Sequence, residues 1–405
     1  MRAIIVGGGI AGLATAWWLR RAGWETTVVE HRAERHGGLD PDATATGTIP
    51  GGYVIDFFGP GYDSIEAMGL RDRVHDHDLR LEGIQYRATN GRRTVRMGTD
   101  ATRRLGGGRL VSLLRGDLEL TLREALGSDA DVRHGLSLTR VEQDPDGVTV
   151  ELTDGTVERA DLLVGADGTH SRVRELVFGP KERFRRYLGA HTAAFLFEDP
   201  EVADALGREL HMLEAPRVQA GVYRLTETTG ATFLCHLAPD GSLPADPRAR
   251  LREVYAGMGW YLPRLLAACP PRPFYDEVEQ IVVPAWSRSR VVLVGDACQA
   301  VSLMAGQGAS MAVAAAEVLG RELGAAGTSG ARIGSALSRY EERVKPVIET
   351  KQAAGRRMAR WFVPASTTRM LVRRQLLRLA ATPLADRVAR PFLASPKLAP
   401  DRQRA

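Results

Sequence analysis

The chain has 405 residues, of which 44% are hydrophobic and 25% are charged, and its formal net charge is +5. This composition excludes a disordered or fibrous protein, and the length predicts a substantial core divided between two or three domains. Three widely spaced cysteines without a C-x-x-C pair support neither a disulfide framework nor a zinc site, and no apolar run reaches the roughly 20 residues of a membrane span. We therefore expect a cytoplasmic protein without a bound metal.

The first thirty residues predict a strand–helix–strand unit. An apolar run over residues 3–6 is typical of a buried parallel strand, a helical stretch covers residues 10–22, and a second strand covers residues 26–29. Glu30 ends that strand. An acid that binds ribose hydroxyls is expected roughly 20 positions after the glycines, and Glu30 lies close to that position. Because all these parts occur in order, we favour a dinucleotide site over glycines that recur by chance in turns.

The turn between the first strand and the helix reads G-x-G-x-x-G, with its glycines at Gly7, Gly9 and Gly12. Gly7 permits the tight turn, Gly9 lets the backbone approach a pyrophosphate, and Gly12 lets the helix pack closely. Ala11 lies at the start of the helix, where unpaired N–H groups and the positive end of the helix dipole attract phosphates. This motif fits FAD and NAD(P) equally, so the rest of the chain must decide between them.

The first half of the chain continues with a long loop and several short elements. In order, these are a loop over residues 31–52, a strand over 53–58 with a helix to 68, a hairpin over 79–97 around Asn90-Gly91, a helix over 113–126, a β-meander over 138–157, a strand over 162–164 and a helix over 171–177. The length of the loop predicts a functional segment over the cofactor. The hairpin lies outside the dinucleotide-fold pattern, so we expect it in a second sheet.

The second half of the chain begins with strands and ends with helices. Its elements are strands within residues 187–237, helices around 251–258 and 262–268, strands over 277–283 and 291–294, and helices over 309–323 and 336–360. Pieces of a dinucleotide fold therefore recur three times, at the N-terminus, around residue 162 and around residue 291, with two β-rich insertions between them. This arrangement excludes an ordinary NAD dehydrogenase with one compact cofactor domain followed by one substrate domain.

Three separated motifs carry a family resemblance: Gly7-x-Gly9-x-x-Gly12 with Glu30, then Gly165-Ala166-Asp167-Gly168, then Gly295-Asp296-Ala297 with Gly306-Gln307-Gly308. In this order and spacing they resemble the class A FAD-dependent monooxygenases, single-component aromatic hydroxylases with the p-hydroxybenzoate hydroxylase fold. Arg115-Gly116-Asp117-Leu118 matches a fourth family element, an arginine on a helix beside the flavin. Residues 52–69 also look like the tetracycline-modifying members, and the chain is similar to polyketide-tailoring members.

The resemblance implies an α/β fold, in which a Rossmann-like FAD-binding domain carries an inserted β-sheet substrate domain and a helical C-terminus. We predict a discontinuous FAD-binding domain over residues 1–70, 100–178 and 285–345, a substrate-binding sheet over 71–99 and 179–284, and a basic helical region over 346–405.

The resemblance also implies which residues bind FAD. They are Gly7, Gly9, Ala11, Gly12, Glu30, Arg115, Asp167, Gly295, Asp296, Gly306, Gly308 and Ala309. Asp296, at the carboxyl end of a parallel strand, can accept a hydrogen bond from a ribityl hydroxyl, and the helix near Ala309 would aim its positive end at the pyrimidine edge of the flavin. Asp167 can instead cap the following helix, a role compatible with cofactor binding. The alternative for Arg115 is an ordinary surface arginine.

The third motif departs from the family pattern. Cys298 and Gln299 stand where Ala-His is usual, and Ser302-Leu303 stand where prolines are common. Gln299 cannot titrate, so any role that needs an imidazole proton is absent. We expect structural roles for the lone histidines of the substrate strands, which are His191, His211 and His236. We assign no catalytic residue, because the flavin performs the redox step and the protein orients the reactants.

The resemblance implies an FAD-dependent monooxygenase that consumes NADPH or NADH as a transient co-substrate. One oxygen atom of O2 would pass to an aromatic, polycyclic or polyketide-like small molecule, most simply by hydroxylation. One alternative is a flavin oxidase or dehydrogenase that inserts no oxygen; a flavin halogenase is disfavoured because the W-x-W-x-I-P element is missing. The other alternative is a non-catalytic FAD-containing partner protein that docks through its basic C-terminal region.

The C-terminal region is strongly basic and rich in leucine. Its apolar residues, among them Leu371, Val372, Leu376, Leu377 and Leu379, spread around most of a helical wheel. A helix that lies on a membrane surface needs segregated faces, so we expect these residues to pack on the protein itself and to close the substrate site. Neither nucleic acid nor a membrane is an expected partner.

Overall fold

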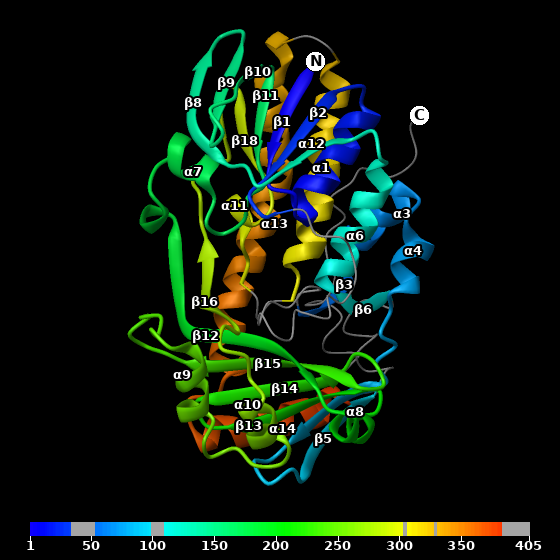
Figure 1. Ribbon diagram of the computed structural model, residues 1–405, viewed down its shortest axis with the longest axis vertical. Coiled ribbons are helices and arrows are strands. Elements are labelled where there is room, and N and C mark those ends of the chain that lie inside the picture. Colours follow the sequence, from blue (N-terminus) through cyan, green and yellow to red (C-terminus); the bar gives the residue numbers. More distant parts are fainter. Residues whose placement is uncertain (34–52, 99–108, 303–305, 328–329, 383–405) are drawn as a thin grey trace.

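The computed structural model describes residues 1–33, 53–98, 109–302, 306–327 and 330–382 (Figure 1), and the structural statements below concern these residues. The loop predicted over residues 31–52 lies outside them from residue 34 onward, as does Leu303 of the third motif.

The first layer is a six-stranded sheet that brings together distant parts of the chain. Its order is β17-β18-β11-β1-β2-β7, and all neighbours run parallel except β17 and β18. The strands are β1 (Arg2–Val6), β2 (Glu25–Glu30), β7 (Asp131–His134), β11 (Leu162–Gly165), β17 (Ser287–Arg288) and β18 (Val291–Leu293). The prediction that strands near residues 3, 162 and 291 share a parallel sheet is therefore confirmed, while β7 and β17 were not predicted.

Helices cover one side of this sheet and a β-meander lies on the other (Figure 1). The helices on that side are α1 (Ile10–Arg21), α6 (Arg115–Leu126), α12 (Gly308–Ala326) and α13 (Ile333–Phe362), whereas α7 (Arg172–Val177) lies against β8 of the meander. The same layer contains α11 (Asp296–Gln299) and the short turns η1 (Lys181–Arg183) and η3 (Gly330–Arg332). The meander is β8 (Leu138–Asp144), β9 (Gly147–Leu152) and β10 (Val157–Ala160). Strands covered on both faces are buried along nearly their whole length, as β1, β2 and β11 are after their first residues.

The second layer is a seven-stranded sheet in the order β16-β12-β15-β14-β13-β4-β5. Its strands are β4 (Gly83–Arg87), β5 (Arg93–Gly98), β12 (Arg185–Glu198), β13 (Glu209–Ala215), β14 (Val218–Arg224), β15 (Thr229–Leu237) and β16 (Phe274–Ile281). The predicted hairpin around Asn90-Gly91 is β4–β5, and β4 joins β13 in this second sheet as expected. The fold class predicted for the chain is thereby confirmed, although the exact domain boundaries stay a prediction.

Side chains alternate between the two faces of the second sheet, as strand geometry requires. Leu213, Val222 and Leu234 point into a core with three short helices, α8 (Pro200–Leu206), α9 (Pro247–Val254) and α10 (Leu262–Ala267). Their strand neighbours Met212, Tyr223 and Phe233 point to the opposite face, toward the first layer. This second face is the floor of the cavity described below, which we call the substrate face.

A small two-stranded sheet links the two layers. It pairs β3 (Val54–Phe58) with β6 (Leu110–Leu114), and β3 is followed by α3 (Pro60–Met68) and α4 (Arg71–Asp76). The helix predicted over residues 113–126 therefore begins too early, because Leu113 and Leu114 belong to β6. Leu114 pairs with Val54 in extended backbone, so that the helix starts at Arg115.

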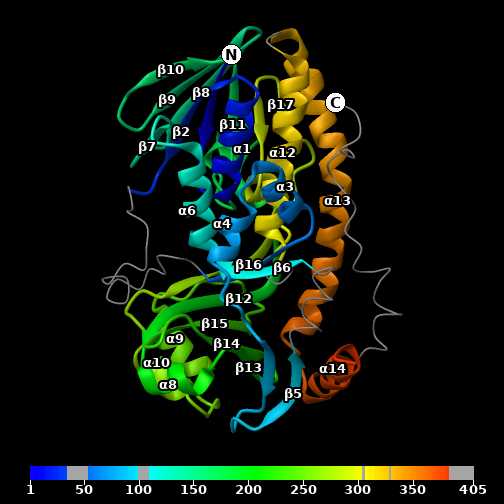
Figure 2. The same cartoon turned by 90° about the vertical axis from the view of Figure 1, so that its right-hand side faces the viewer.

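Two C-terminal helices complete the chain (Figure 2). The long helix α13 runs from beside α12 down to the substrate sheet, and α14 (Thr367–Ala380) lies against β5 and β13. The expectation that this region packs on the protein itself is confirmed for α14, but most of the apolar residues named for this packing do not contribute to it. Leu371, Val372, Leu376 and Leu379 are all exposed. Within the described chain, no helix has the length and apolarity to cross a membrane.

Candidate functional site

A large cavity lies between the two sheets. Its volume is about 1180 Å³, which is above the roughly 300–1,000 Å³ of an ordinary ligand pocket, so it has room for a cofactor and a second molecule. Most of the residues predicted to bind FAD line it: Gly7, Gly9, Ala11, Glu30, Arg115, Asp167, Asp296, Gly306, Gly308 and Ala309. Gly12 and Gly295 are not part of the wall, and they shape the backbone behind it.

The glycine-rich turn brings the N-terminus of α1 to the cavity wall. Gly7 has a φ of +107°, and a Cβ there would lie 2.4 Å from the carbonyl oxygen of Ala166 in the neighbouring strand turn. A Cβ on Gly12 would lie 1.8 Å from the carbonyl oxygen of Gly7, so no side chain fits where α1 packs on the turn. Gly9 is the N-cap of α1 and offers no capping side chain. The first N–H groups of α1 therefore remain available to an anion in the cavity.

Glu30 organises a charged network at one end of the cavity. One carboxylate oxygen accepts from the backbone N–H of Gly8 at 2.6 Å, and the other accepts from the backbone N–H and Nε of Arg32 at 2.9 and 2.8 Å. Arg32 also reaches Glu119 at 3.1 Å, and Arg115 donates to Glu119 at 3.0 Å. Burial alone would raise the pKa of Glu30, but the hydrogen bonds and charge of Arg32 outweigh it and lower the pKa to about 2.

Arg115 is thus no isolated surface arginine, since it lines the cavity and pairs across one helical turn with Glu119. Sequence reasoning missed Arg32 and Glu119. The local signal for Arg32 was its position two residues after Glu30, but the contact of Arg32 with α6 joins residues 87 apart.

Asp167 combines a structural contact with an unused acceptor. Its Oδ2 accepts from the backbone N–H groups of Arg172 and Val173 at 2.7 and 3.1 Å. Asp167 therefore caps α7, which is one of the two roles that the sequence predicted. Its Oδ1 is buried and has no hydrogen-bond partner in the described chain, and the residue lines the cavity. Burial raises the pKa of this carboxyl group. A buried acceptor without a donor is costly, so a hydroxyl or amide of a ligand at this wall would stabilise it.

Asp296 and the start of α12 form the opposite part of the wall. The Asp296 side chain opens into the cavity, and no hydrogen bond to a described residue holds its carboxylate. Burial raises its pKa, and the positive charge of Arg115 lowers it in part. Helix α12 begins at Gly308 with neither a capping side-chain bond nor an acidic residue in its first turn. Gly306 and Ala309 border the cavity there, so uncapped N–H groups face it.

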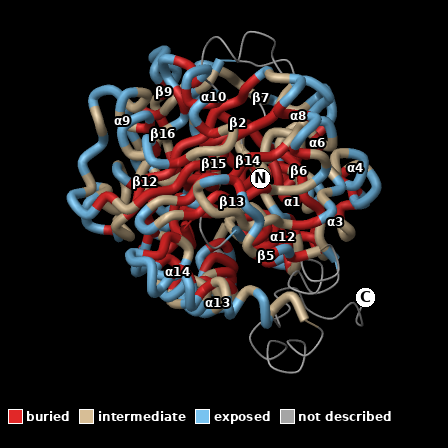
Figure 3. Tube along the Cα trace, turned by 90° about the horizontal axis from the view of Figure 1, so that it is seen from below, coloured by how far each residue is buried: buried red, intermediate tan, exposed pale blue. Residues whose placement is uncertain are grey.

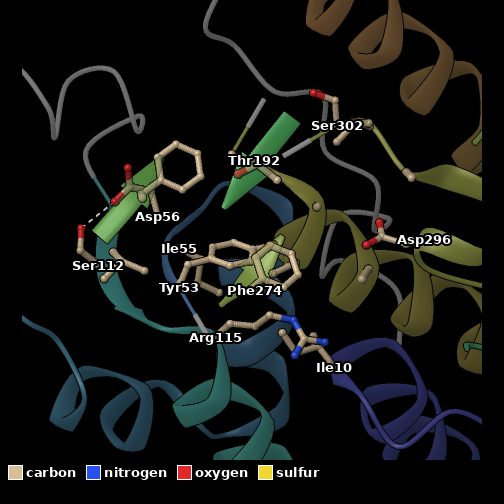
Figure 4. A pocket seen from close by; sticks show the side chains of 18 of the residues that line it. Ile10, Tyr53, Ile55, Asp56, Ser112, Arg115, Thr192, Phe274, Asp296 and Ser302 are labelled. Atoms are coloured by element: carbon tan, nitrogen blue, oxygen red, sulfur yellow. Dashed lines mark hydrogen bonds between the residues drawn. The ribbon is translucent and has the colours of Figure 1, made fainter. Parts of the chain in front are cut away.

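Aromatic side chains fill the middle of the cavity (Figure 4). The rings of Tyr53 and Phe274 lie 6.3 Å apart at an interplanar angle of 39°, above Arg115 in this view. Burial raises the pKa of Tyr53 to about 12, so its hydroxyl stays protonated at neutral pH. These rings, with Tyr223 and Phe233 from the substrate face, give the cavity a mainly apolar wall.

Asp56 is an acidic side chain that sequence reasoning did not single out. It projects from β3 into the cavity, and its Oδ1 accepts from the hydroxyl of Ser112 on β6 at 2.7 Å. Burial raises its pKa, and the charge of Asp78 adds to the effect while the Ser112 hydrogen bond opposes it. In Figure 4 this pair lies on the other side of the Tyr53 and Phe274 rings from Asp296. The available signal was an acid in the middle of the apolar run over residues 53–58.

Of the departures from the family motif, Cys298 and Gln299 lie away from the cavity wall, whereas Ser302 lines it. Gln299 is buried, and neither its Oε1 nor its Nε2 has a partner among the described residues. Cys298 is also buried, which raises the pKa of its thiol far above the usual range. The histidines assigned structural roles are absent from the described lining residues; His191 and His236 both contact the hydroxyl of Tyr275 at 3.0 Å. No cluster of metal-ligating side chains occurs in the described ranges.

Together, the parallel sheet, two uncapped helix N-termini, the free Asp167 oxygen and the unpaired Asp296 carboxylate fit a flavin dinucleotide. The fold and cavity therefore define a dinucleotide-dependent oxidoreductase in which a second sheet closes over the cofactor.

Comparisons with known proteins identify the family. A family model described as an FAD binding domain matches residues 1–239 and 273–353. An uncharacterised protein of Mycobacterium tuberculosis is 35% identical over 340 residues, which cover 81% of this chain and 86% of the relative. A Streptomyces platensis enzyme named 3-amino-4-hydroxybenzoate 2-monooxygenase PtmB3 is 31% identical over 398 residues, 96% of this chain and 93% of the relative. The crystal structure of Klebsiella pneumoniae HpxO with FAD and uric acid aligns with a TM-score of 0.78 and 25% identity, covering 97% and 96% of the two chains.

The chain belongs to the FAD binding domain family and is a class A FAD-dependent monooxygenase. The predicted family, enzyme class and FAD cofactor are thereby confirmed, and a non-catalytic partner protein is no longer a competitive interpretation.

Proposed function

We propose that this monooxygenase oxidises NADPH or NADH and inserts one oxygen atom of O2 into an aromatic or polyketide-like small molecule, most simply by hydroxylation. The observation that carries the proposal is the cavity itself, in which a polar end fit for a dinucleotide opens into an aromatic end that contains Asp56. Two relatives support this substrate class, since one is named an aminohydroxybenzoate monooxygenase and another was crystallised with uric acid.

We propose that the predicted cofactor residues divide FAD between them by chemistry. The start of α1 at Gly9 would bind the pyrophosphate, Glu30 would accept from the ribose hydroxyls, and Asp296 would accept from a ribityl hydroxyl. The start of α12 at Ala309 would face the pyrimidine edge of the flavin, where its positive dipole end favours negative charge. Bound FAD supplies the redox chemistry, namely hydride uptake from the nicotinamide and activation of O2.

Asp56 is proposed to orient the substrate and to accept a proton from it. Its Oδ1 is held by Ser112, so its Oδ2 is left to accept from a phenolic hydroxyl or an amine of an aromatic ring. Because burial raises its pKa toward the working pH, the carboxylate is a better proton acceptor than an exposed aspartate. Removal of the phenolic proton makes the ring more electron-rich, which favours its attack on an electrophilic oxygen.

The apolar wall is proposed to exclude water from the reaction. Four aromatic residues line this cavity: Tyr53, Phe233, Phe274 and Phe362. A dry site limits wasteful loss of activated oxygen to the solvent.

Substrate-stimulated NAD(P)H oxidation by the yellow holoenzyme tests the proposal. A panel of hydroxylated and aminated aromatic acids is expected to raise the rate over the substrate-free rate and to give a product heavier by one oxygen atom. An oxidase or dehydrogenase would instead yield a product without added oxygen. If no compound stimulates NADH or NADPH consumption, the proposed electron donor or substrate class is wrong.

A further inference from the structure

Helix α14 is packed with charged side chains inward. Arg373 is buried and forms an ion pair with Glu214 of β13, which is itself fully buried, and it donates to Gln219 at 2.7 Å. Arg374 reaches the other oxygen of Glu214 at 2.5 Å. Besides Arg373, Met370 is the only buried residue of α14. These contacts hold α14 on the substrate sheet, so its orientation is set by buried ion pairs.

The outer side of α14 is correspondingly apolar. Leu371, Val372, Leu376 and Leu379 are between 44% and 63% exposed. At 3.6 residues per turn these four positions fall on one side of the helix, whereas Met370 and Leu377 fall on the inner side.

The end of α13 extends this surface. Met358 and Trp361 are 55% and 40% exposed. Of the ten large hydrophobic side chains that are exposed in the described chain, six belong to residues 358–379. Figure 3 shows α14 at the rim of the molecule beside the end of α13, when the substrate sheet is viewed from below. We call these six residues, Met358, Trp361, Leu371, Val372, Leu376 and Leu379, the apolar rim.

The chain segments that form the apolar rim carry only positive charges. No acidic residue occurs between Glu349 and Asp386 in the sequence. Four arginines at its edges are exposed: Arg357, Arg360, Arg369 and Arg378. No carboxylate of the described chain forms an ion pair with any of these four. A partner of the apolar rim must therefore present apolar area within a negatively charged border.

We propose that the apolar rim docks reversibly on an anionic lipid surface. Leucine and methionine side chains can enter the boundary between headgroups and acyl chains, while the bordering arginines meet lipid phosphates and carboxylates. Trp361 stands at the edge, where tryptophan is favoured at membrane–water interfaces. A second copy of the chain fits this surface poorly, because a twofold contact would set the four arginines against their own counterparts.

The docking surface is separate from the proposed chemistry but lies close to the cavity. Phe362, the residue after Trp361, lines the cavity, whereas no residue of α14 does so. In the docked protein, a residue of the cavity wall would directly follow a residue that contacts lipid. The proposal does not depend on which substrate or electron donor the enzyme uses.

Sedimentation with lipid vesicles tests the docking proposal on the full-length holoenzyme. The protein is expected to bind vesicles of phosphatidylcholine mixed with phosphatidylserine, and to bind pure phosphatidylcholine at least about tenfold more weakly, with binding to the mixture lost at high salt. Leu376→Ser with Leu379→Ser should lower binding to the mixed vesicles by at least about tenfold, because two exposed leucines no longer enter the lipid. Arg357→Gln with Arg360→Gln should lower it by a similar factor.

Matched controls are Val157→Ser and Leu243→Ser, which remove exposed apolar side chains far from the rim. Flavin absorbance and NAD(P)H oxidation should stay at wild-type levels in all variants, since none of these residues lines the cavity. Equal loss of binding in the controls, or no preference for anionic vesicles, would overturn the proposal. A dimer in sedimentation equilibrium that dissociates in the Leu376→Ser, Leu379→Ser variant would assign the rim to a second copy and also refute lipid docking.

Discussion

Replacement of Glu30 by glutamine removes the acceptor at the centre of the cofactor end of the cavity. Glu30→Gln keeps the size of the side chain but replaces one carboxylate oxygen with an N–H2 group, which cannot accept. The donors that now converge on this carboxylate, the N–H of Gly8 and the N–H and Nε of Arg32, would lose part of their pairing. The change therefore tests whether the network stabilises the empty site as well as the bound cofactor.

The magnitude follows from the pKa of Glu30, which is lowered from 4.5 to about 2 in the folded protein. At about 1.4 kcal/mol for each pKa unit, the ionised form contributes about 3 kcal/mol to the free energy of unfolding. Because the folded pKa is the lower one, this contribution is complete above pH 4.5 and is lost as the pH falls toward 2. The stability difference between wild type and Glu30→Gln should thus be constant near neutral pH and should shrink in acid.

Urea unfolding of the FAD-free proteins at several pH values measures this difference. Glu25→Gln is the matched control. Glu25 begins the same strand but is exposed, and its ion pair with Arg2 is long, with 4.0 Å between Oε1 and Nε. We expect about 3 kcal/mol of destabilisation for Glu30→Gln and less than about 1 kcal/mol for the control. A loss for Glu30→Gln that is no larger than that of Glu25→Gln, or that is unchanged between pH 7 and pH 3, would refute the reasoning.

Three further changes probe the turn, the C-terminal helix and the substrate end. Gly12→Ala should give protein without FAD, measured by flavin absorbance, because its Cβ would lie 1.8 Å from a backbone carbonyl oxygen, whereas Gly334→Ala in open space should keep FAD. Arg373→Ala should lower the free energy of unfolding in urea by about 3 kcal/mol, since Glu214 loses a buried partner. Asp56→Asn should keep FAD content but lower kcat/KM for a phenolic substrate by about 100-fold. Wild-type values in any of these assays would contradict the stated role.

The parts of the fold that the sequence predicts are those set by local patterns. The glycine turn, the acid at Glu30 and the three buried strands of the parallel sheet each carry their signal within a few residues. The capping of α7 by Asp167 was foreseeable for the same reason, as donor and acceptor lie five and six residues apart. The second sheet was foreseeable in part, through the Asn90-Gly91 turn and alternating apolar positions.

The parts that the sequence does not predict depend on distant contacts. Leu113 and Leu114 fit a helical stripe, yet they are strand residues because β3 pairs with them. The strand β7 is four residues long and has no buried residue of its own, so only its pairing with β2 reveals it. The orientation of α14 depends on Glu214, 159 residues before Arg373, and an apolar wheel gives no sign of it.

The candidate site follows the same division. Motif residues such as Asp296 could be named from the sequence. Arg32 and Asp56 could not, because each is held by a partner far away in the chain: Arg32 by Glu119, and Asp56 by Ser112. The roles of all these residues in holding FAD and substrate stay proposals until variants are measured.

The most direct test of the central claim is the fate of molecular oxygen. The holoenzyme is supplied with NADPH or NADH, an aromatic substrate that stimulates turnover and O2 labelled with ¹⁸O, and the product is analysed by mass spectrometry. We predict a product that carries one labelled oxygen atom, with the label absent when ¹⁸O is supplied as water. A product without label, formed with labelled hydrogen peroxide in proportion to the substrate oxidised and without consumption of NAD(P)H, would contradict oxygen insertion and identify the enzyme as an oxidase.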